Sequence, residues 1–227
     1  MRDSILTIPI SELFEPKTGC PICRMRDTLE QRTVEYIMGA AMMEPDVRQE
    51  TNQLGFCNHH MHAMQHCNNR LSLALMTQTR LDTIRQTLQS RPKLWEGKQG
   101  KKKKLSAMLE TCFVCSKIDW GMERLLTTMF ELFADAEFRA LFAQQEQLCL
   151  PHYDLLLTLA PQQLSKQLLP EFEAACAALV QKQLNTLYED VSHFCNMYDY
   201  RHAGPDADWG NSRDSIERAV AFLTGRE

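Results

Sequence analysis

The spacing of cysteines and histidines constrains this chain more than any other feature. The motif Cys-x2-Cys, followed by 33 residues and then Cys-x2-His, occurs twice with an offset of 92 residues. The first copy consists of Cys20, Cys23, Cys57 and His60, and the second of Cys112, Cys115, Cys149 and His152. Each copy supplies three thiolates and one imidazole, which is a complete ligand set for a structural zinc ion. The pattern therefore predicts two metal sites and an internal duplication.

The duplication selects one ligand from the histidine-rich segment "CNHHMHAMQHC". His60 is matched by His152 in the second copy, whereas the neighbouring His59 is matched by Pro151. Proline has no ligating side chain, so His60 is the histidine that both copies can use. We expect His60 and His152 to be ligands and His59 not to be one.

The other histidines of this segment leave a second site open. His62 and His66 are four residues apart, a spacing that places two imidazoles on one helix face. In a metalloprotease helix a glutamate would follow the first histidine, but Ala63 follows His62. Either His59, His62 and His66 form a further site, or they form a polar helix face beside the metal.

The cysteine count indicates metal binding, and the ligand set favours zinc over an iron–sulfur cluster without excluding the cluster. The chain has nine cysteines, and its N-terminus lacks the continuous apolar stretch of a secretory signal. We therefore expect reduced thiols used for metal binding rather than a disulfide framework. Two zinc ions are the predicted cofactors, and an iron–sulfur cluster is the alternative. Cys67, Cys176 and Cys195 have no partner in the repeat, and we expect them to be buried or free thiols.

Apolar residues recur at helical spacing through most of the sequence, and no run alternates as a strand would. We predict an all-α protein of two duplicated helical halves, each organised around its own Cys3His site. Long helices at 58–89 and 162–197, the second started or kinked by Pro170, carry more apolar positions than one half could cover. We therefore expect the long helices to pack on each other across the halves. Asp135 is predicted to cap a short helix that follows it.

Composition also divides the chain. Residues 97–104 contain two glycines and five lysines, which is typical of a linker. This predicts a first helical repeat at 1–96, the basic linker at 97–104, and a second repeat at 105–200. Residues 201–227 are expected to form a loop and an amphipathic helix closed by Gly225.

Two groups of motifs resemble a bacterial family catalogued as a domain of unknown function. The first group is "IPISELFEP", "CPICR", "MEPDVRQETNQLGFCNHH" and "NRLSLALM", and the second is "YDYR", "DWG" and "RDSIERAVAFLTG". The resemblance covers nearly the whole chain. It implies a cytoplasmic bacterial protein and no particular activity.

The sequence argues against several functions. The net charge is −4, and outside the basic segment at 91–104 the chain is clearly acidic, which opposes binding to nucleic acid. No apolar run approaches the roughly 20 residues that a membrane helix needs. We find no catalytic triad or phosphate-binding glycine loop. The leading interpretation is a non-enzymatic binding or adaptor module for an unknown protein or small molecule. The rival is a redox or thiol-chemistry protein carrying an iron–sulfur cluster or a reactive zinc–thiolate.

Overall fold

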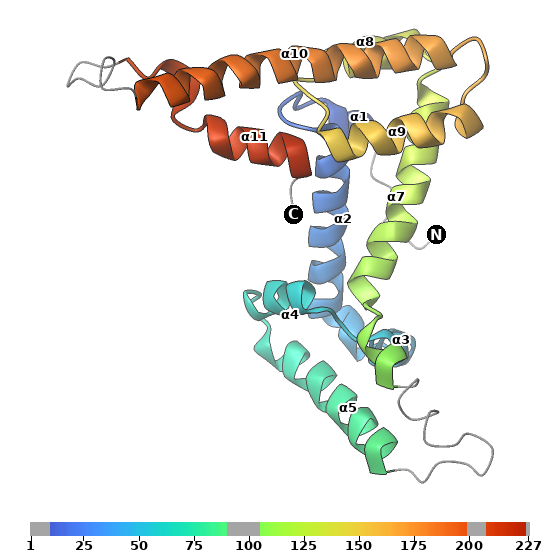
Figure 1. The fold of residues 1–227 in the computed structure, drawn as a ribbon. Helices are drawn as coiled ribbons and strands as arrows, with labels where there is room; N and C mark the ends of the chain where they lie inside the picture. Colours follow the sequence, from blue (N-terminus) through green and yellow to red (C-terminus); the bar gives the residue numbers. More distant parts are fainter. Residues whose placement is uncertain (1–9, 90–104, 199–207, 226–227) are drawn as a thin grey trace. The chain divides into compact units, whose positions relative to one another are not determined.

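The computed structural model describes residues 10–89, 105–198 and 208–225 (Figure 1). These residues form α-helices and short 3-10 helices, and no strand occurs among them. The predicted all-α fold is therefore confirmed. The basic segment at 97–104 lies outside the described residues.

The described residues divide into two compact units. Residues 27–89 and 105–123 belong to unit 1, whereas residues 10–26, 124–198 and 208–225 belong to unit 2. The boundaries fall inside helices α2 (Pro21–Met38) and α7 (Phe113–Leu132). The division into repeats at 1–96 and 105–200 remains a prediction about the sequence.

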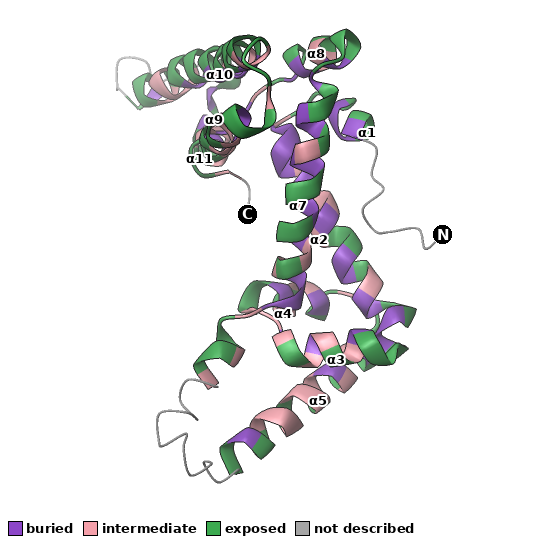
Figure 2. Cartoon of the chain, turned by 90° about the vertical axis from the view of Figure 1, so that its right-hand side faces the viewer, coloured by how far each residue is buried: buried purple, intermediate pink, exposed green. Residues whose placement is uncertain are grey.

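Unit 1 is built around a layer of short helices that support α5. It contains η1 (Ala40–Met43), α3 (Pro45–Leu54), α4 (Asn58–Gln65) and α5 (Arg70–Gln89), with parts of α2 and α7. Helix α5 packs on α3 and α4, and exposed or half-buried residues follow one another along much of its length (Figure 2). Arg80 of α5 donates hydrogen bonds to the backbone oxygens of Asn52 at 2.6 Å and Met108 at 2.6 Å. This guanidinium satisfies a carbonyl at the end of α3, which has no partner within its own helix.

The single helix predicted at 58–89 is wrong, because the chain breaks it between α4 and α5. Asn69 stands directly before α5, and its side-chain oxygen accepts a hydrogen bond from the Ser72 N–H at 3.2 Å. Its amide nitrogen donates to Met38 O at 2.8 Å. An asparagine that caps a new helix competes with continuation of the preceding helix.

Unit 2 is organised by its longest helix, α10. It contains α1 (Ile10–Phe14), α8 (Ala136–Ala143), α9 (Leu150–Gln163), α10 (Leu169–Met197), η2 (Gly210–Ser212) and α11 (Ser215–Thr224). Helix α10 packs against α8, α9 and α11. The packing predicted between the long helices of the two halves stays a prediction.

Three local predictions about helix ends in unit 2 are confirmed. Asp135 caps α8, and its carboxylate accepts from the N–H groups of Glu137 and Phe138. Pro170 lies in the first turn of α10, where a proline needs no backbone partner. Helix α10 begins at Leu169, later than predicted, and Gly225 with a φ of 78° ends α11.

The core of unit 2 is a cluster of phenylalanines. Phe172 of α10 lies 4.9 Å from Phe133 and 5.5 Å from Phe142 between ring centroids. Phe14 of α1 stacks on Phe142 at 5.8 Å. All four side chains are almost completely buried, and each such ring contributes a few kcal/mol when it leaves water. This core holds α1, and thus the segment that leads into Cys20, against α8 and α10.

Candidate metal centres

Each predicted ligand pair lies at the start of a helix. Helices α2, α4, α7 and α9 begin directly after Cys20, Cys57, Cys112 and Cys149. In each pair the second ligand follows three residues later, within the first turn and on the same side of the helix. Free N–H groups and the helix dipole favour negative charge at this end, so all four helix starts stabilise thiolates.

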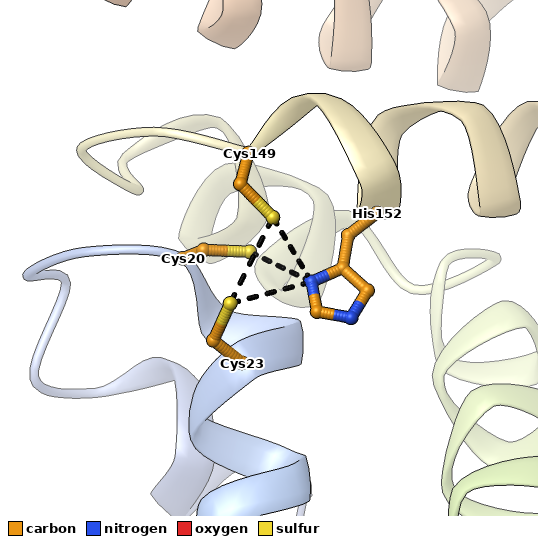
Figure 3. Close-up of side chains that lie close together, drawn as sticks. All are labelled: Cys20, Cys23, Cys149 and His152. Carbon is orange, nitrogen blue, oxygen red and sulfur yellow. Dashed lines mark hydrogen bonds between the residues drawn. The ribbon is translucent and has the colours of Figure 1, made fainter. Parts of the chain in front are cut away.

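The structure brings all eight predicted residues into two clusters. The Cys20 cluster consists of Cys20, Cys23, Cys149 and His152 (Figure 3). The Cys57 cluster consists of Cys57, His60, Cys112 and Cys115. Each cluster lies within one unit, the Cys20 cluster in unit 2 and the Cys57 cluster in unit 1.

This pairing differs from the expectation that each half closes its own site. Each cluster instead takes its Cys-x2-Cys pair from one half and its Cys-x2-His pair from the other. Helix length gives the physical reason. From Cys23 to the end of α2 the chain advances about 22 Å, and the intervening α3 is only about 15 Å long. Helix α3 alone is therefore too short to carry Cys57 back along α2 to Cys23, and α7 advances the chain away from Cys115 in the same way.

The ligand atoms of the Cys20 cluster point toward one another (Figure 3). The Nδ1 atom of His152 lies 3.6 Å from Cys20 Sγ, 3.4 Å from Cys23 Sγ and 3.1 Å from Cys149 Sγ. The sulfurs of Cys23 and Cys149 are 3.7 Å apart. His152 therefore presents one ring nitrogen to all three thiols.

The Cys57 cluster repeats this geometry. The Nδ1 atom of His60 lies 3.1 Å from Cys57 Sγ, 3.3 Å from Cys112 Sγ and 3.4 Å from Cys115 Sγ. The sulfurs of Cys57 and Cys115 are 3.9 Å apart. The same nitrogen of the second histidine thus faces the second set of thiols.

These separations fit a single tetrahedral ion. Zinc–sulfur bonds of about 2.3 Å and zinc–nitrogen bonds of about 2.0 Å place two sulfurs about 3.8 Å apart, and a sulfur and a nitrogen about 3.5 Å apart. The distances in both clusters lie close to these values. A disulfide needs sulfurs about 2.0 Å apart, and all nine cysteines are free. Each cluster can therefore hold a metal ion.

Comparison with known proteins places the chain in a family. The model of Family of unknown function (DUF6062) matches residues 1–227. The chain belongs to this family. Searches of curated proteins and of solved structures gave no significant match. The resemblance inferred from the motifs is confirmed, and the DUF6062 family itself carries no described activity.

Among the described residues of this DUF6062 chain, no helix has the length and apolarity to cross a membrane. The two clusters differ in how far their residues are buried. Cys149 is 1% exposed and His60 is 3% exposed, whereas Cys57 and Cys115 are half-buried. The Cys57 cluster is therefore the more accessible of the two at its thiols.

Crowding of the thiols shifts their acidity. Burial, together with hydrogen bonding and repulsion from Cys112 and Cys57, raises the pKa of Cys115 to about 12. Hydrogen bonds with neighbouring cysteines raise the pKa of Cys149 as well. Burial lowers the pKa of His152, but hydrogen bonds with cysteine sulfurs outweigh burial and raise it to about 9. Without a cation these groups hold their protons at neutral pH, and a bound metal would displace those protons.

Hydrogen bonds between the loops hold each cluster in place. Beside the Cys57 cluster, the Phe113 N–H donates to Gly55 O at 2.8 Å, and the Thr111 hydroxyl donates to Leu54 O at 2.7 Å. These bonds join the two segments that carry the ligand pairs. The protein therefore orients this site through its backbone as well as through the ligands.

Two hydrogen bonds likewise join the segments that carry the ligand pairs of the Cys20 cluster. The Glu146 N–H donates to Lys17 O at 2.9 Å, and the Gly19 N–H donates to the Glu146 carboxylate at 2.5 Å. Lys17 and Gly19 precede Cys20, and Glu146 precedes Cys149. In both clusters, then, the segments that lead into the two ligand pairs are hydrogen-bonded to each other.

The Cys57 cluster has an acidic neighbour that sequence reasoning missed. Glu30 Oε1 lies 3.1 Å from Nε2 of His60 and 2.7 Å from Nε2 of His59. Glu30, His59 and His60 form the third group of potential ligands in the described residues, and neither His62 nor His66 belongs to one. The second site considered for His59, His62 and His66 is therefore not assembled. No local spacing links Glu30 to the histidines, so the sequence held no signal for this contact.

The three remaining thiols are separate from the clusters. Cys67 is half-buried and its sulfur lies 3.6 Å from Ala63 O. Cys176 is completely buried, and burial, with the charge of Glu173, raises its pKa to about 12. Cys195 is exposed. Each has the buried or free character expected of a thiol without a repeat partner.

Proposed function

We propose that this protein is a helical binding or adaptor module that carries two structural zinc ions and catalyses no reaction. One observation carries the proposal: in each cluster three thiols and one imidazole nitrogen surround a single point at tetrahedral spacing. Structural zinc sites are closed by four protein ligands, whereas catalytic sites keep one position for water or substrate. With four ligands each, both clusters are of the closed kind.

The spacing favours a mononuclear ion over an iron–sulfur cluster. All ligand atoms in a cluster lie within 4.8 Å of one another. In a multi-iron cluster the ligands bind different iron atoms, which requires a wider ring of cysteines. Thiolate with imidazole suits zinc well, and zinc needs no redox partner.

The binding role has support from the surface of unit 2. A groove of about 430 Å³ between α10 and α11 is lined by apolar side chains that include Leu187, Val191 and Phe222. Tyr188 and Leu223 beside it are strongly exposed. Contiguous apolar surface of this kind marks interaction sites in soluble proteins. The partner is an unknown protein or small molecule.

We also propose a cellular location for the protein and an evolutionary origin for its repeated ligand pairs. Nine free cysteines suit a compartment that keeps thiols reduced, and we place the protein in the bacterial cytoplasm. The acidic balance of the chain opposes a nucleic-acid partner. The repeated spacing of the ligand pairs supports an ancestral duplication.

One observation favours the rival function, a reactive zinc–thiolate. Cys57 and Cys115 of the Cys57 cluster are half-buried, so they are less shielded from small reagents than the buried cysteines. A zinc-bound thiolate that solvent can reach is a possible nucleophile. The same exposure is absent from Cys20, Cys23 and Cys149, which are buried.

Purification without oxygen, followed by elemental analysis and an absorption spectrum, tests the metal. We expect a colourless protein with two equivalents of zinc and no iron. A brown protein containing iron and sulfide would overturn the zinc proposal in favour of the cluster alternative.

Replacement of zinc by cobalt tests the closed coordination. Four-coordinate Co²⁺ with thiolate ligands absorbs in the visible range, and its bands change when a new ligand enters. We expect azide and cyanide, at concentrations that leave both metals bound, to have no effect on these bands. A spectral change would reveal an open position and argue for catalysis. Unchanged bands together with alkylation of zinc-bound Cys57 at a rate typical of free thiols would favour the reactive-thiolate rival.

A further inference from the structure

A contact that the metal ligand set does not explain lies on the far side of the His60 ring from the cysteines. The Nδ1 atom of His60 faces the three sulfurs of the Cys57 cluster, and its Nε2 atom lies 3.1 Å from Glu30 Oε1 on α2. A histidine that binds metal through one nitrogen carries its proton on the other. The Nε2–H group of a metal-bound His60 would therefore lie beside this carboxylate, at hydrogen-bond distance but not aligned for a hydrogen bond. A small rotation of the Glu30 carboxyl group would align the two.

Low solvent exposure strengthens the contact between His60 and Glu30. The His60 side chain is only 4% exposed and Glu30 is 20% exposed, so little water competes for either group. A carboxylate that accepts a hydrogen bond from a ligand imidazole fixes the tautomer and the ring orientation. It also makes the imidazole a better electron donor to the metal.

His59 is a second histidine in contact with Glu30, on the solvent-exposed side of the carboxylate. Its Nε2 atom lies 2.7 Å from the same Glu30 oxygen, and its side chain is 60% exposed. A carboxylate oxygen has lone pairs for two donors. His59 can therefore hold Glu30 in place while the same oxygen accepts a hydrogen bond from the Nε2–H group of His60.

We propose that Glu30 is a positioning residue for the metal ligand His60, and that His59 anchors Glu30. This gives the adjacent histidines of "CNHH" two different tasks, one inside the metal site and one behind it. The inference rests on the proposed function, since it presupposes a metal in the Cys57 cluster.

The Cys20 cluster differs in this respect. In the described part of the chain, no acidic side chain makes an ion pair with His152. The two sites of one molecule thus differ in whether a carboxylate supports the histidine. The Cys20 site serves as an internal control in every measurement on the Cys57 site.

The test is Glu30→Gln, with Glu35→Gln as the matched control. Glu35 lies on the same helix and is exposed, and its carboxylate accepts a hydrogen bond from Gln31 rather than from a histidine. Both variants remove one negative charge from α2. Affinity for each of the two zinc equivalents would be measured by competition with a chromophoric chelator.

We expect Glu30→Gln to weaken one equivalent about 10- to 100-fold and to leave the other unchanged. His59→Ala should have a smaller effect on the same equivalent and should still bind two zinc ions. Glu35→Gln should match the wild type. Retention of the second equivalent at wild-type affinity shows that the variant is folded.

A second measurement reads the contact directly. Long-range ¹H–¹⁵N spectra of the zinc-loaded protein report which ring nitrogen of each histidine is protonated. We expect the Nε2 proton of His60 to be visible and shifted downfield by its hydrogen bond, and to lose that shift in Glu30→Ala. Unchanged affinity in Glu30→Gln with an unchanged His60 signal in Glu30→Ala would overturn the inference alone. A wild-type protein with fewer than two metal equivalents would overturn the proposed function, and the inference with it.

Discussion

Gly55, two residues before the predicted ligand Cys57, leaves less room for a side chain than the other glycines for which the structure gives close contacts. Its φ of 66° and ψ of −158° lie in a region that is essentially restricted to glycine. A Cβ at this position would lie 2.8 Å from Nη2 of Arg80 and 3.0 Å from its Cζ. That guanidinium donates to the backbone oxygens of Asn52 and Met108. Gly55→Ala therefore strains the backbone and displaces the half-buried guanidinium of Arg80 from its acceptors.

The two effects have separate magnitudes. Backbone strain in this region costs about 1–3 kcal/mol, and partial loss of the charged hydrogen bonds of Arg80 costs about 1–2 kcal/mol more. The sum is about 2–5 kcal/mol. For a protein of this size, each kcal/mol lowers the melting temperature by about 2–4 °C. We expect Gly55→Ala to melt about 10 °C below the wild type when both are saturated with zinc.

Gly19 supplies the matched control. It also has a φ of 66° and stands directly before the ligand Cys20, but nothing lies within 4 Å of its Cβ position. Gly19→Ala should therefore show the backbone cost alone, about 1–2 kcal/mol. In an Arg80→Ala background the additional loss caused by Gly55→Ala should fall to a similar value. Equal destabilisation by Gly55→Ala and Gly19→Ala, with no coupling to Arg80, would refute the reasoning.

Four further predictions concern the metals and thiols. The double variant Cys23→Ser/His152→Ala should lose one zinc equivalent, because both residues belong to one cluster. Cys23→Ser/His60→Ala should lose two, because its residues belong to different clusters. Elemental analysis distinguishes the two pairings, and the opposite result would show that each half closes its own site. In the native zinc-loaded protein, iodoacetamide should modify the exposed Cys195. It should modify Cys176 only after denaturant is added, because burial shields this thiol and raises its pKa to about 12. Mass spectrometry of digests measures both reactions, and modification of Cys176 before denaturation would contradict the prediction. Since the thiol pKa of Cys115 is raised to about 12 without metal, protons compete with zinc and affinity should weaken as the pH falls; chelator competition between about pH 8 and pH 6 measures the trend, and a flat profile would contradict it. Trypsin should cut first within residues 97–104. Because each cluster has ligands on both sides of the cut, the two fragments should elute together on gel filtration while zinc is bound and separate after strong chelation. Separation of the fragments while zinc is still bound would count against this pairing.

Local features of the fold and the site could be predicted from the sequence. The ligand residues follow from a spacing of three, which needs only the first turn of a helix to bring two side chains together. The caps at Asp135 and Pro170 are likewise local, since they depend on one side chain and the backbone next to it. Asn69 shows the limit of periodicity, because apolar spacing continues through a position where a capping side chain ends one helix and starts another.

The pairing of the ligands could not be predicted in the same way. Both copies have identical spacing, so each Cys-x2-Cys pair suits either Cys-x2-His pair equally well. Helix lengths favour the observed pairing, since α2 and α7 run without a break for 18 and 20 residues and carry the chain away from each Cys-x2-Cys pair. The contact of Glu30 with His60 depends on where α4 lies against α2, and no short motif contains that information.

The exchange of ligand pairs also sets an order for maturation of the chain during synthesis. The segment ending at Cys115 completes the inner set of ligands, and the outer set, begun at Cys20, is completed only at His152. One metal-binding loop is thus nested inside the other. A ribosome adds roughly 5–20 residues per second, so the Cys20 and Cys23 thiols must wait several seconds for their partners. During that interval these thiols depend on cellular reductants to stay reduced, and a product truncated before Cys149 retains Cys20 and Cys23 without their partners.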